Sequence, residues 1–221
     1  MNRQSYDAVI FDMDGIIFDS EREVLESWLI IAEKYGIPNF REPYLRCIGT
    51  TRARTMEILK EAFGEDFPYD EYRAEQSALF HQKNDGGRLP LKPGVREILA
   101  FLKEQGKKIG LASSTRRETV FAELRDAGIL PFFDAVITGE SVKKSKPAPD
   151  IFLFACETLG VLPGRTFAIE DSYNGIKAAF AGGLRPIMVP DLLPATEEMK
   201  ALSETVLKSL FHVTEYLGKN G

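Results

Sequence analysis

The chain is poor in cysteine: only Cys47 and Cys156 occur among its 221 residues, and they lie far apart. Two distant cysteines do not make the dense disulfide framework of small secreted domains, so we expect two reduced thiols. No apolar run approaches the roughly 20 residues that a membrane-spanning helix needs. Asp7, Asp12 and Asp14 interrupt the N-terminal segment where a signal peptide is continuously apolar. We therefore expect a cytoplasmic protein that does not enter a membrane.

An excess of positive charge is also lacking. Lys and Arg number 28 against 33 Asp and Glu, so the formal net charge is -5 and the isoelectric point is near 5.3. Nucleic acids and anionic lipids are bound by basic surfaces, and this composition argues against both as partners. Histidine is limited to His81 and His212, and neither has the sequence context of a catalytic triad.

What the sequence does contain, from Pro93 onward, is a regular alternation of strand and helix patterns. Helices are expected after Pro93-Gly94 and around Val120 to Leu124, at 149–159 and 175–181, and in a last segment that ends near Leu217. Strands are expected at 108–112, 135–138, 166–169, 185–189 and 206–207. Together with an apolar first strand at 8–11, this alternation predicts a parallel sheet with helices on both faces.

Residues 19–86 interrupt this alternation because they contain no convincing strand. Helices are expected around residues 25–32, 42–47, 56–63 and 68–80. The interval is far longer than an ordinary crossover between neighbouring strands, so we predict an insertion. The expected fold class is α/β, with a Rossmann-like parallel-sheet core (1–18 and 87–221) and an inserted α-helical cap (19–86).

Polar clusters follow several predicted strands at the edge where open parallel sheets bind ligands. Asp12 and Asp14 follow the first strand, and residues two apart on an extended chain point the same way. The other clusters are Ser113 with Ser114, Lys146, and Glu170 with Asp171. Each alone has a simpler explanation, namely a polar turn, a helix cap, a solvated lysine or a helix-start charge pair. Their occurrence at one sheet edge favours a common site.

The combination of these groups fits phosphoryl transfer. Neighbouring carboxylates are costly unless a cation neutralises them, so we expect Asp12 and Asp171, with Glu170 nearby, to hold Mg²⁺. Asp12 can attack phosphorus to form an aspartyl phosphate, while Asp14 is placed to protonate the leaving alcohol and to deprotonate the attacking water. The groups expected to bind the phosphoryl oxygens are Ser113, Ser114 and Lys146.

The chain resembles the haloacid dehalogenase superfamily in four motifs that occur in order over nearly its whole length. They are Phe11-Asp12-Met13-Asp14-Gly15, Ser113, Lys146-Pro147 and Glu170-Asp171-Ser172. The resemblance implies that Asp12 is the nucleophile, Asp14 the acid/base, and Ser113 and Lys146 phosphate ligands. It also implies that Asp12, the backbone carbonyl of Asp14 and Asp171 ligate Mg²⁺, with Glu170 as a ligand or just behind. Asp14 argues against the dehalogenases of the family, which lack an acid/base carboxylate there.

The place of the helical insertion resembles the β-phosphoglucomutase-like branch, which includes phosphatases and phosphohexomutases. Where β-phosphoglucomutase has a histidine and a lysine that serve its sugar-phosphate intermediate, this chain has Val24 and Ile48. We therefore expect a monomeric Mg²⁺-dependent phosphatase acting on a small phosphate ester, in particular a sugar phosphate. A phosphohexomutase and a non-catalytic metabolite-binding module are the alternatives. The cap residues expected to decide specificity are Ser20, Glu21, Gly49 and Arg52, although Arg52 equally fits an exposed helix start.

Overall fold

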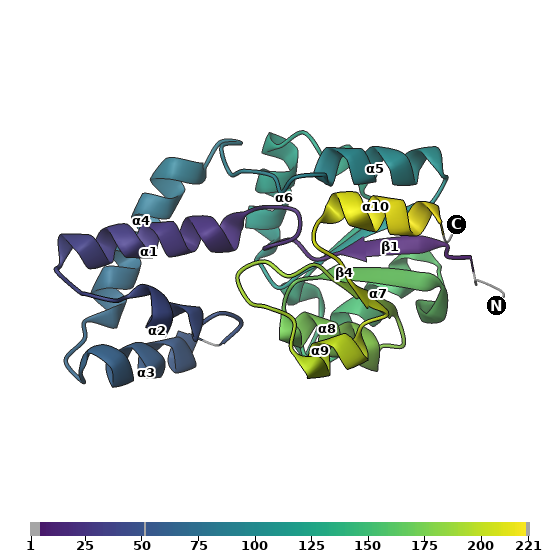
Figure 1. The fold of residues 1–221 in the computed structure, drawn as a ribbon. Coiled ribbons are helices and arrows are strands. Elements are labelled where there is room, and N and C mark those ends of the chain that lie inside the picture. The colour runs from purple at the N-terminus through teal and green to yellow at the C-terminus, as the bar shows by residue number, and fades with distance from the viewer. Residues whose placement is uncertain (1–4, 51, 220–221) are drawn as a thin grey trace.

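The computed structural model describes residues 5–50 and 52–219. A parallel sheet with the strand order β3-β2-β1-β4-β5-β6 forms the centre of one half of the molecule (Figure 1). The strands are β1 (Ala8–Phe11), β2 (Lys108–Ser113), β3 (Ala135–Thr138), β4 (Thr166–Glu170), β5 (Arg185–Met188) and β6 (Thr205–Val206). Every predicted strand is confirmed, although β6 begins one residue earlier than expected. Strand β1 pairs with β2 and β4 and is entirely buried, which explains its unbroken apolar sequence.

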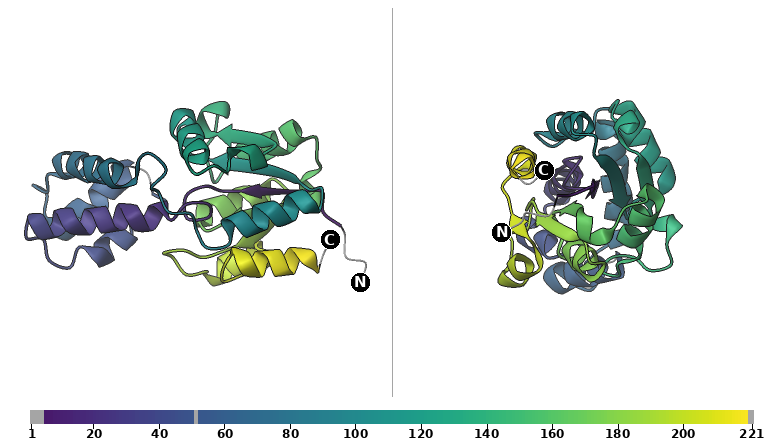
Figure 2. Two further views of the ribbon diagram at one scale, coloured as in Figure 1. Left: turned by 90° about the horizontal axis from the view of Figure 1, so that it is seen from above. Right: turned by 90° about the vertical axis from the view of Figure 1, so that its right-hand side faces the viewer.

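Helices cover both faces of this sheet, as the end-on view in Figure 2 shows. They are α5 (Val95–Glu104), α6 (Arg117–Asp126), α7 (Asp150–Leu159), α8 (Tyr173–Ala181), α9 (Glu197–Leu202) and α10 (Leu210–Gly218). Val9 and Phe11 pack in one hydrophobic cluster with α5, α6 and α10, whereas Ile10 packs with α7 and α8. Successive strand residues thus serve opposite faces of the sheet. The fold class is the predicted α/β class.

The sequence did not predict helix α9. It is only six residues long, and Met199 is its one buried residue. A single buried residue leaves no apolar periodicity to detect. Its start is nevertheless well defined, because the side chain of Thr196 accepts a hydrogen bond from the backbone N–H of Met199.

Between β1 and α5 the chain forms four helices that lie to one side of the sheet (Figures 1 and 2). We call α1 (Ser20–Lys34), α2 (Arg41–Leu45), α3 (Arg52–Phe63) and α4 (Tyr69–Asn84) the cap helices. All four were predicted. They enclose a hydrophobic cluster of their own, which contains Trp28, Phe40 and Leu59 and is separate from the clusters on the sheet. The aromatic residues of this segment therefore pack against one another, as expected.

Two linkers run side by side between the cap helices and the sheet. Phe18 in the first linker forms an isolated β-bridge with Leu91 in the second. Lys92 follows directly, and its Nζ lies 2.9 Å from Asp19 Oδ1 and 2.6 Å from Asp191 Oδ1. One lysine therefore ties the start of the cap helices to the loop after β5.

Two further features concern the cysteines and the lengths of the helices. Cys47 and Cys156 are buried and free, which confirms the prediction of two reduced thiols. Across residues 5–50 and 52–219, no helix is both long enough and apolar enough to cross a membrane.

Candidate active site

The predicted site residues meet at a cavity between the sheet edge and the cap helices. The cavity has a volume of about 340 Å³. The predicted residues that line it are Asp12, Asp14, Glu21, Gly49, Ser114, Lys146 and Asp171. Ser20, Arg52, Ser113 and Glu170 do not line it. The structure therefore brings together the carboxyl ends of strands β1 and β4, the loops after β2 and β3, and the cap.

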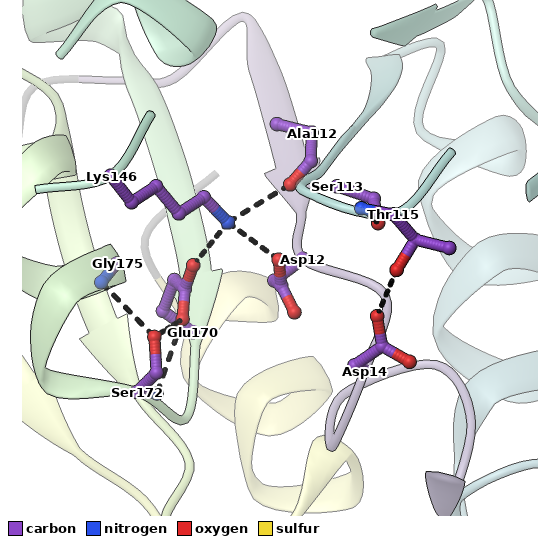
Figure 3. Close-up of polar contacts among 9 residues, drawn as sticks. All are labelled: Asp12, Asp14, Ala112, Ser113, Thr115, Lys146, Glu170, Ser172 and Gly175. Atoms are coloured by element: carbon purple, nitrogen blue, oxygen red, sulfur yellow. Dashed lines mark hydrogen bonds and ion pairs between the residues drawn. The ribbon is translucent and has the colours of Figure 1, made fainter. Parts of the chain in front are cut away.

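Lys146 is the centre of the polar network at the sheet edge (Figure 3). Its Nζ donates hydrogen bonds to Asp12 Oδ1 at 2.5 Å, to Glu170 Oε1 at 2.6 Å and to the carbonyl oxygen of Ala112 at 3.0 Å. Burial by itself would lower the pKa of Lys146, but the carboxylates of Asp12 and Glu170 outweigh it and raise the pKa above its ordinary value. The lysine is therefore a fixed positive charge beside Asp12.

Glu170 lies behind this lysine and is completely buried. One of its oxygens accepts from Lys146, and the other accepts from the backbone N–H of Ser172 at 3.1 Å and from its hydroxyl at 2.9 Å. Gly175, in the first turn of α8, makes room for this arrangement, because a Cβ there would overlap the Glu170 carboxylate. Ser172 caps helix α8, because its Oγ accepts a hydrogen bond of 3.0 Å from the backbone N–H of Gly175. The local sequence thus fixes Glu170 in one position.

Asp12, Glu170 and Asp171 form an acidic group whose potential ligand atoms lie within 4.8 Å of one another. Burial, and then the repulsion from neighbouring carboxylates, raises the pKa of Asp171 well above its usual range. Burial raises the pKa of Asp12 as well, and the positive charge of Lys146 offsets part of this increase. Gly15 allows the close approach of Asp171, because its φ is +81° and a Cβ there would lie 2.8 Å from Asp171 Cγ. Closely spaced carboxylate oxygens with excess negative charge fit a hard divalent cation such as Mg²⁺.

Asp14 is held by hydroxyl groups from two distant segments. Ser20, in the first turn of α1, donates to Asp14 Oδ1 at 2.7 Å, and Thr115, after β2, donates to Asp14 Oδ2 at 2.8 Å (Figure 3 shows the second bond). Ser113 is completely buried, and its Oγ accepts from the backbone N–H of Thr115 at 3.1 Å. Ser114, and not Ser113, lines the cavity.

The cap contributes Glu21 and Gly49 to the cavity. Burial raises the pKa of Glu21 to about 7, with smaller contributions from the charges of Asp14 and Asp191. Gly49 lies between α2 and α3, in what we call the cap loop. Its carbonyl oxygen accepts a hydrogen bond of 3.1 Å from Asn174 Nδ2, so the cap loop contacts helix α8 directly. The sequence had not pointed to Asn174, because a contact across 125 residues leaves no local signal.

Two other predicted cap residues lie elsewhere. Ser20 is 5% exposed and turned toward Asp14. Arg52 is exposed, pairs with Asp70 at 2.8 Å, and lines a second cavity within the cap rather than this one.

Comparisons with known proteins agree with this geometry. A family model for haloacid dehalogenase-like hydrolases matches residues 9–189. The chain is 32% identical over 215 residues to a phosphorylated carbohydrates phosphatase of Thermotoga maritima, covering 96% of each protein. It is 36% identical over 185 residues to β-phosphoglucomutase of Bacillus subtilis, covering 80% of each.

A solved structure shows the same fold. It is a HAD family hydrolase from Deinococcus radiodurans R1 with bound phosphate and sodium, and it superposes with a TM-score of 0.84 at 24% identity, covering 98% of this chain and 96% of that one. The family match spans most of the chain, and the four motifs that carry the resemblance converge in space. The chain belongs to the haloacid dehalogenase-like hydrolase family.

Proposed function

We propose that the protein is a Mg²⁺-dependent phosphatase that hydrolyses a small phosphorylated metabolite, and that this metabolite is a sugar phosphate. The observation that carries the proposal is the meeting of Asp12 with Lys146 and Asp171 at the floor of an open cavity. The name of the relative from Thermotoga maritima, a phosphorylated carbohydrates phosphatase, supports both the reaction and the substrate class.

In the first half-reaction, a carboxylate oxygen of Asp12 attacks phosphorus, and the bond between phosphorus and the ester oxygen breaks. Asp14 donates its proton to that oxygen, so the product leaves as a neutral alcohol. In the second half-reaction, Asp14 takes a proton from a water molecule, which attacks the phosphorus of the aspartyl phosphate. Inorganic phosphate leaves, and Asp12 returns to its carboxylate form.

The remaining residues compensate charge and bind the phosphoryl oxygens. Lys146 and the loop at Ser113 and Ser114 would bind these oxygens, which keeps the phosphorus in line with Asp12. Asp12, Asp171 and the backbone carbonyl of Asp14 would hold Mg²⁺, with Glu170 as a ligand or directly behind. When bound, Mg²⁺ supplies positive charge that offsets the repulsion between the anionic nucleophile and the anionic substrate.

A phosphohexomutase is the second candidate function, and the 36% identity to β-phosphoglucomutase favours it. The side chains at the two positions that distinguish the mutase speak against it. Val24 and Ile48 both line the second cavity within the cap, and neither side chain can form a hydrogen bond or titrate. We therefore place hydrolysis first.

We further propose that residues 19–86 act as a cap that closes over the substrate and excludes water. Glu21 and Gly49 line the cavity and would contact the substrate there. The hydrogen bond from Ser20 to Asp14 fits a positioning role better than substrate contact. A monomeric state and a cytoplasmic location complete the proposal.

The test is release of inorganic phosphate from a panel of phosphorylated sugars, sugar alcohols, nucleotides and glycolate. We expect turnover of several sugar phosphates with Mg²⁺ and loss of turnover with excess EDTA, restored by added Mg²⁺. β-Glucose 1-phosphate is assayed separately for the 6-phosphate isomer. Isomerisation faster than hydrolysis would favour the mutase, and inactivity toward the whole panel would indicate a non-catalytic binding module.

A further inference from the structure

The cap helices enclose a second cavity of about 350 Å³, which the proposed chemistry does not use. We call it the cap chamber; its walls include Trp28, Tyr44, Arg52, Tyr69, Arg73 and Gln76. Glu21, Gly49 and Thr50 line both the cap chamber and the cavity at Asp12. The two cavities therefore adjoin at these residues.

Helix α4 directs a polar face at the cap chamber. Tyr69, Arg73 and Gln76 are spaced at i, i+4 and i+7, so they lie on the same side of the helix, and all three line the chamber. The sequence predicted a helix here but not which of its faces is polar, because Arg73 and Gln76 look like ordinary exposed residues of a surface helix.

Gln76 is a buried amide without a partner. Its residue is 6% exposed, and none of the hydrogen bonds among the described residues involves its side chain. A glutamine amide can donate two hydrogen bonds and accept others. Its place on the chamber wall gives these groups a use, because a polar ligand in the chamber can satisfy them.

The charged residues that line the cap chamber are Arg52, Arg73 and Glu21. Arg73 is exposed to the chamber and has no ion pair within the described part of the chain, whereas Arg52 is paired with Asp70. Among the described residues that line the chamber, Glu21 is the one carboxylate, and it also lines the cavity at Asp12. A free guanidinium beside an unpartnered amide is a typical recognition site for a carboxylate or a phosphate.

We propose that Arg73 and Gln76 are specificity-determining residues that select phosphate esters whose alcohol portion carries a second anionic group at its far end. The proposal rests on the phosphatase function above. The phosphate to be cleaved lies at Asp12, and the second anion, a carboxylate or another phosphate, lies in the cap chamber. The preferred substrate is therefore a phosphorylated sugar acid or a sugar bisphosphate rather than a neutral sugar monophosphate.

The experiment compares matched substrates. Sorbitol 6-phosphate and 6-phosphogluconate differ only in a terminal hydroxymethyl or carboxylate group, and fructose 6-phosphate with fructose 1,6-bisphosphate tests a second phosphate. We expect kcat/KM to be at least about 10-fold higher for one of the anionic members than for its neutral partner. The pair that shows the preference identifies the anion.

Variants of Arg73 and Gln76 test whether the cap chamber causes the preference for the anionic substrate. Arg73→Met and Gln76→Glu should raise KM for the anionic substrate about 10-fold or more, with kcat nearly unchanged, because binding is weakened equally in the ground and transition states. Neither should change the kinetics of the neutral partner more than about twofold. Arg41→Met, which alters an exposed arginine of α2 outside the chamber, is the matched control. Circular dichroism melting verifies that each variant folds.

Two results would overturn the inference. Equal kcat/KM within both pairs, or a preference that survives Arg73→Met, would do so while leaving the phosphatase function intact. Failure to hydrolyse any phosphate ester in the panel is a different result: it would overturn the proposed function, and this inference with it.

Discussion

At the scale of single residues, Asp14 is the best-defined group of the site. Both of its carboxylate oxygens accept hydroxyl hydrogen bonds, one from Ser20 on the cap side and one from Thr115 on the sheet side. An acid/base group works only when its proton-bearing oxygen points at the reacting atom. These two hydroxyls therefore determine the orientation of Asp14.

Removing either hydroxyl should weaken proton transfer without removing it. We expect Ser20→Ala and Thr115→Val each to lower kcat about 5- to 10-fold with little change in KM, a fraction of the 10²- to 10⁴-fold that acid/base catalysis typically contributes. Steady-state kinetics of phosphate release provide the measurement. Thr158→Val is the control, because that hydroxyl donates to the carbonyl of Phe154 and neither residue lines the cavity at Asp12. An unchanged kcat in both site variants would show that Asp14 does not need these contacts.

The residue scale also shows what the sequence can reveal. Asp12, Asp14, Lys146 and Asp171 were predictable as one group because each follows an element that ends at the same sheet edge, and parallel topology brings such ends together. The direction of a side chain is not readable in this way. Ser113 was expected to bind phosphoryl oxygens, but it is completely buried. The hydrogen bond from Asn174 to the carbonyl oxygen of Gly49 was not predicted.

At the scale of elements, helix α6 carries a carboxyl group in an unfavourable place. One oxygen of Glu123 is buried and has no hydrogen-bond partner in the described part of the chain. Burial, followed by the charges of Asp14 and Asp85, raises the pKa of Glu123 from its ordinary 4.5 to about 7. Glu123 lines a further cavity beside the second linker, where Glu118 and Asp126 are also present.

This carboxyl group makes stability depend on pH. Between about pH 4.5 and 7 the folded protein retains a proton that the unfolded chain has released, so stability falls as pH rises through this range. We expect Glu123→Gln to raise the free energy of unfolding by about 1 kcal/mol at pH 8, allowing for solvent screening, and to have little effect at pH 4.5. Urea unfolding at the two pH values measures the difference. An equal effect at both pH values would exclude titration of Glu123 as the cause.

Elements themselves were the most predictable level of this structure. Strands β1 to β5 have strong apolar runs that end at polar residues, and their positions were predicted to within a residue or two. Strand β6 was also predicted, one residue late, although it has only two residues. Helix α9 was not, because Met199 is the single buried residue among its six.

At the scale of the whole molecule, Lys92 links the cap helices to the sheet. It pairs with Asp19 in the first linker and with Asp191 after β5, and the Asp191 side chain is only 3% exposed. Burial would lower the pKa of Lys92, but its two carboxylate partners outweigh that effect and raise it. The ion pairs therefore favour the charged form of this lysine, which joins three segments.

Loss of this lysine should leave a buried carboxylate without a partner. We expect Lys92→Met to lower the free energy of unfolding by about 2 kcal/mol or more, whereas Lys103→Met, which breaks the more exposed pair with Asp134, should cost less than about 1 kcal/mol. Urea unfolding of the two variants provides the comparison. An equal loss of unfolding free energy in the two variants would mean that the ion pairs of Lys92 stabilise the fold no more than an ordinary surface ion pair does.

The insertion could be predicted from the length of the interval between the first two strands, since residues 19–86 are too many for an ordinary crossover. The interior of the insertion could not. The sequence predicted helix α4, but its buried residues include Gln76 and Asn84, which no apolar pattern indicates. Arg73 and Gln76 line a cap chamber that forms only when the cap helices pack together.

The most direct test of the account is the rate of phosphate release by Asp12→Asn beside the wild-type protein. Asparagine has nearly the same shape but cannot form the aspartyl phosphate. The account predicts a loss of at least about 10³-fold with Mg²⁺ present, an unchanged circular dichroism spectrum, and wild-type activity in the control Asp126→Asn, which alters an exposed aspartate of α6. Phosphate release by Asp12→Asn at the wild-type rate would contradict it.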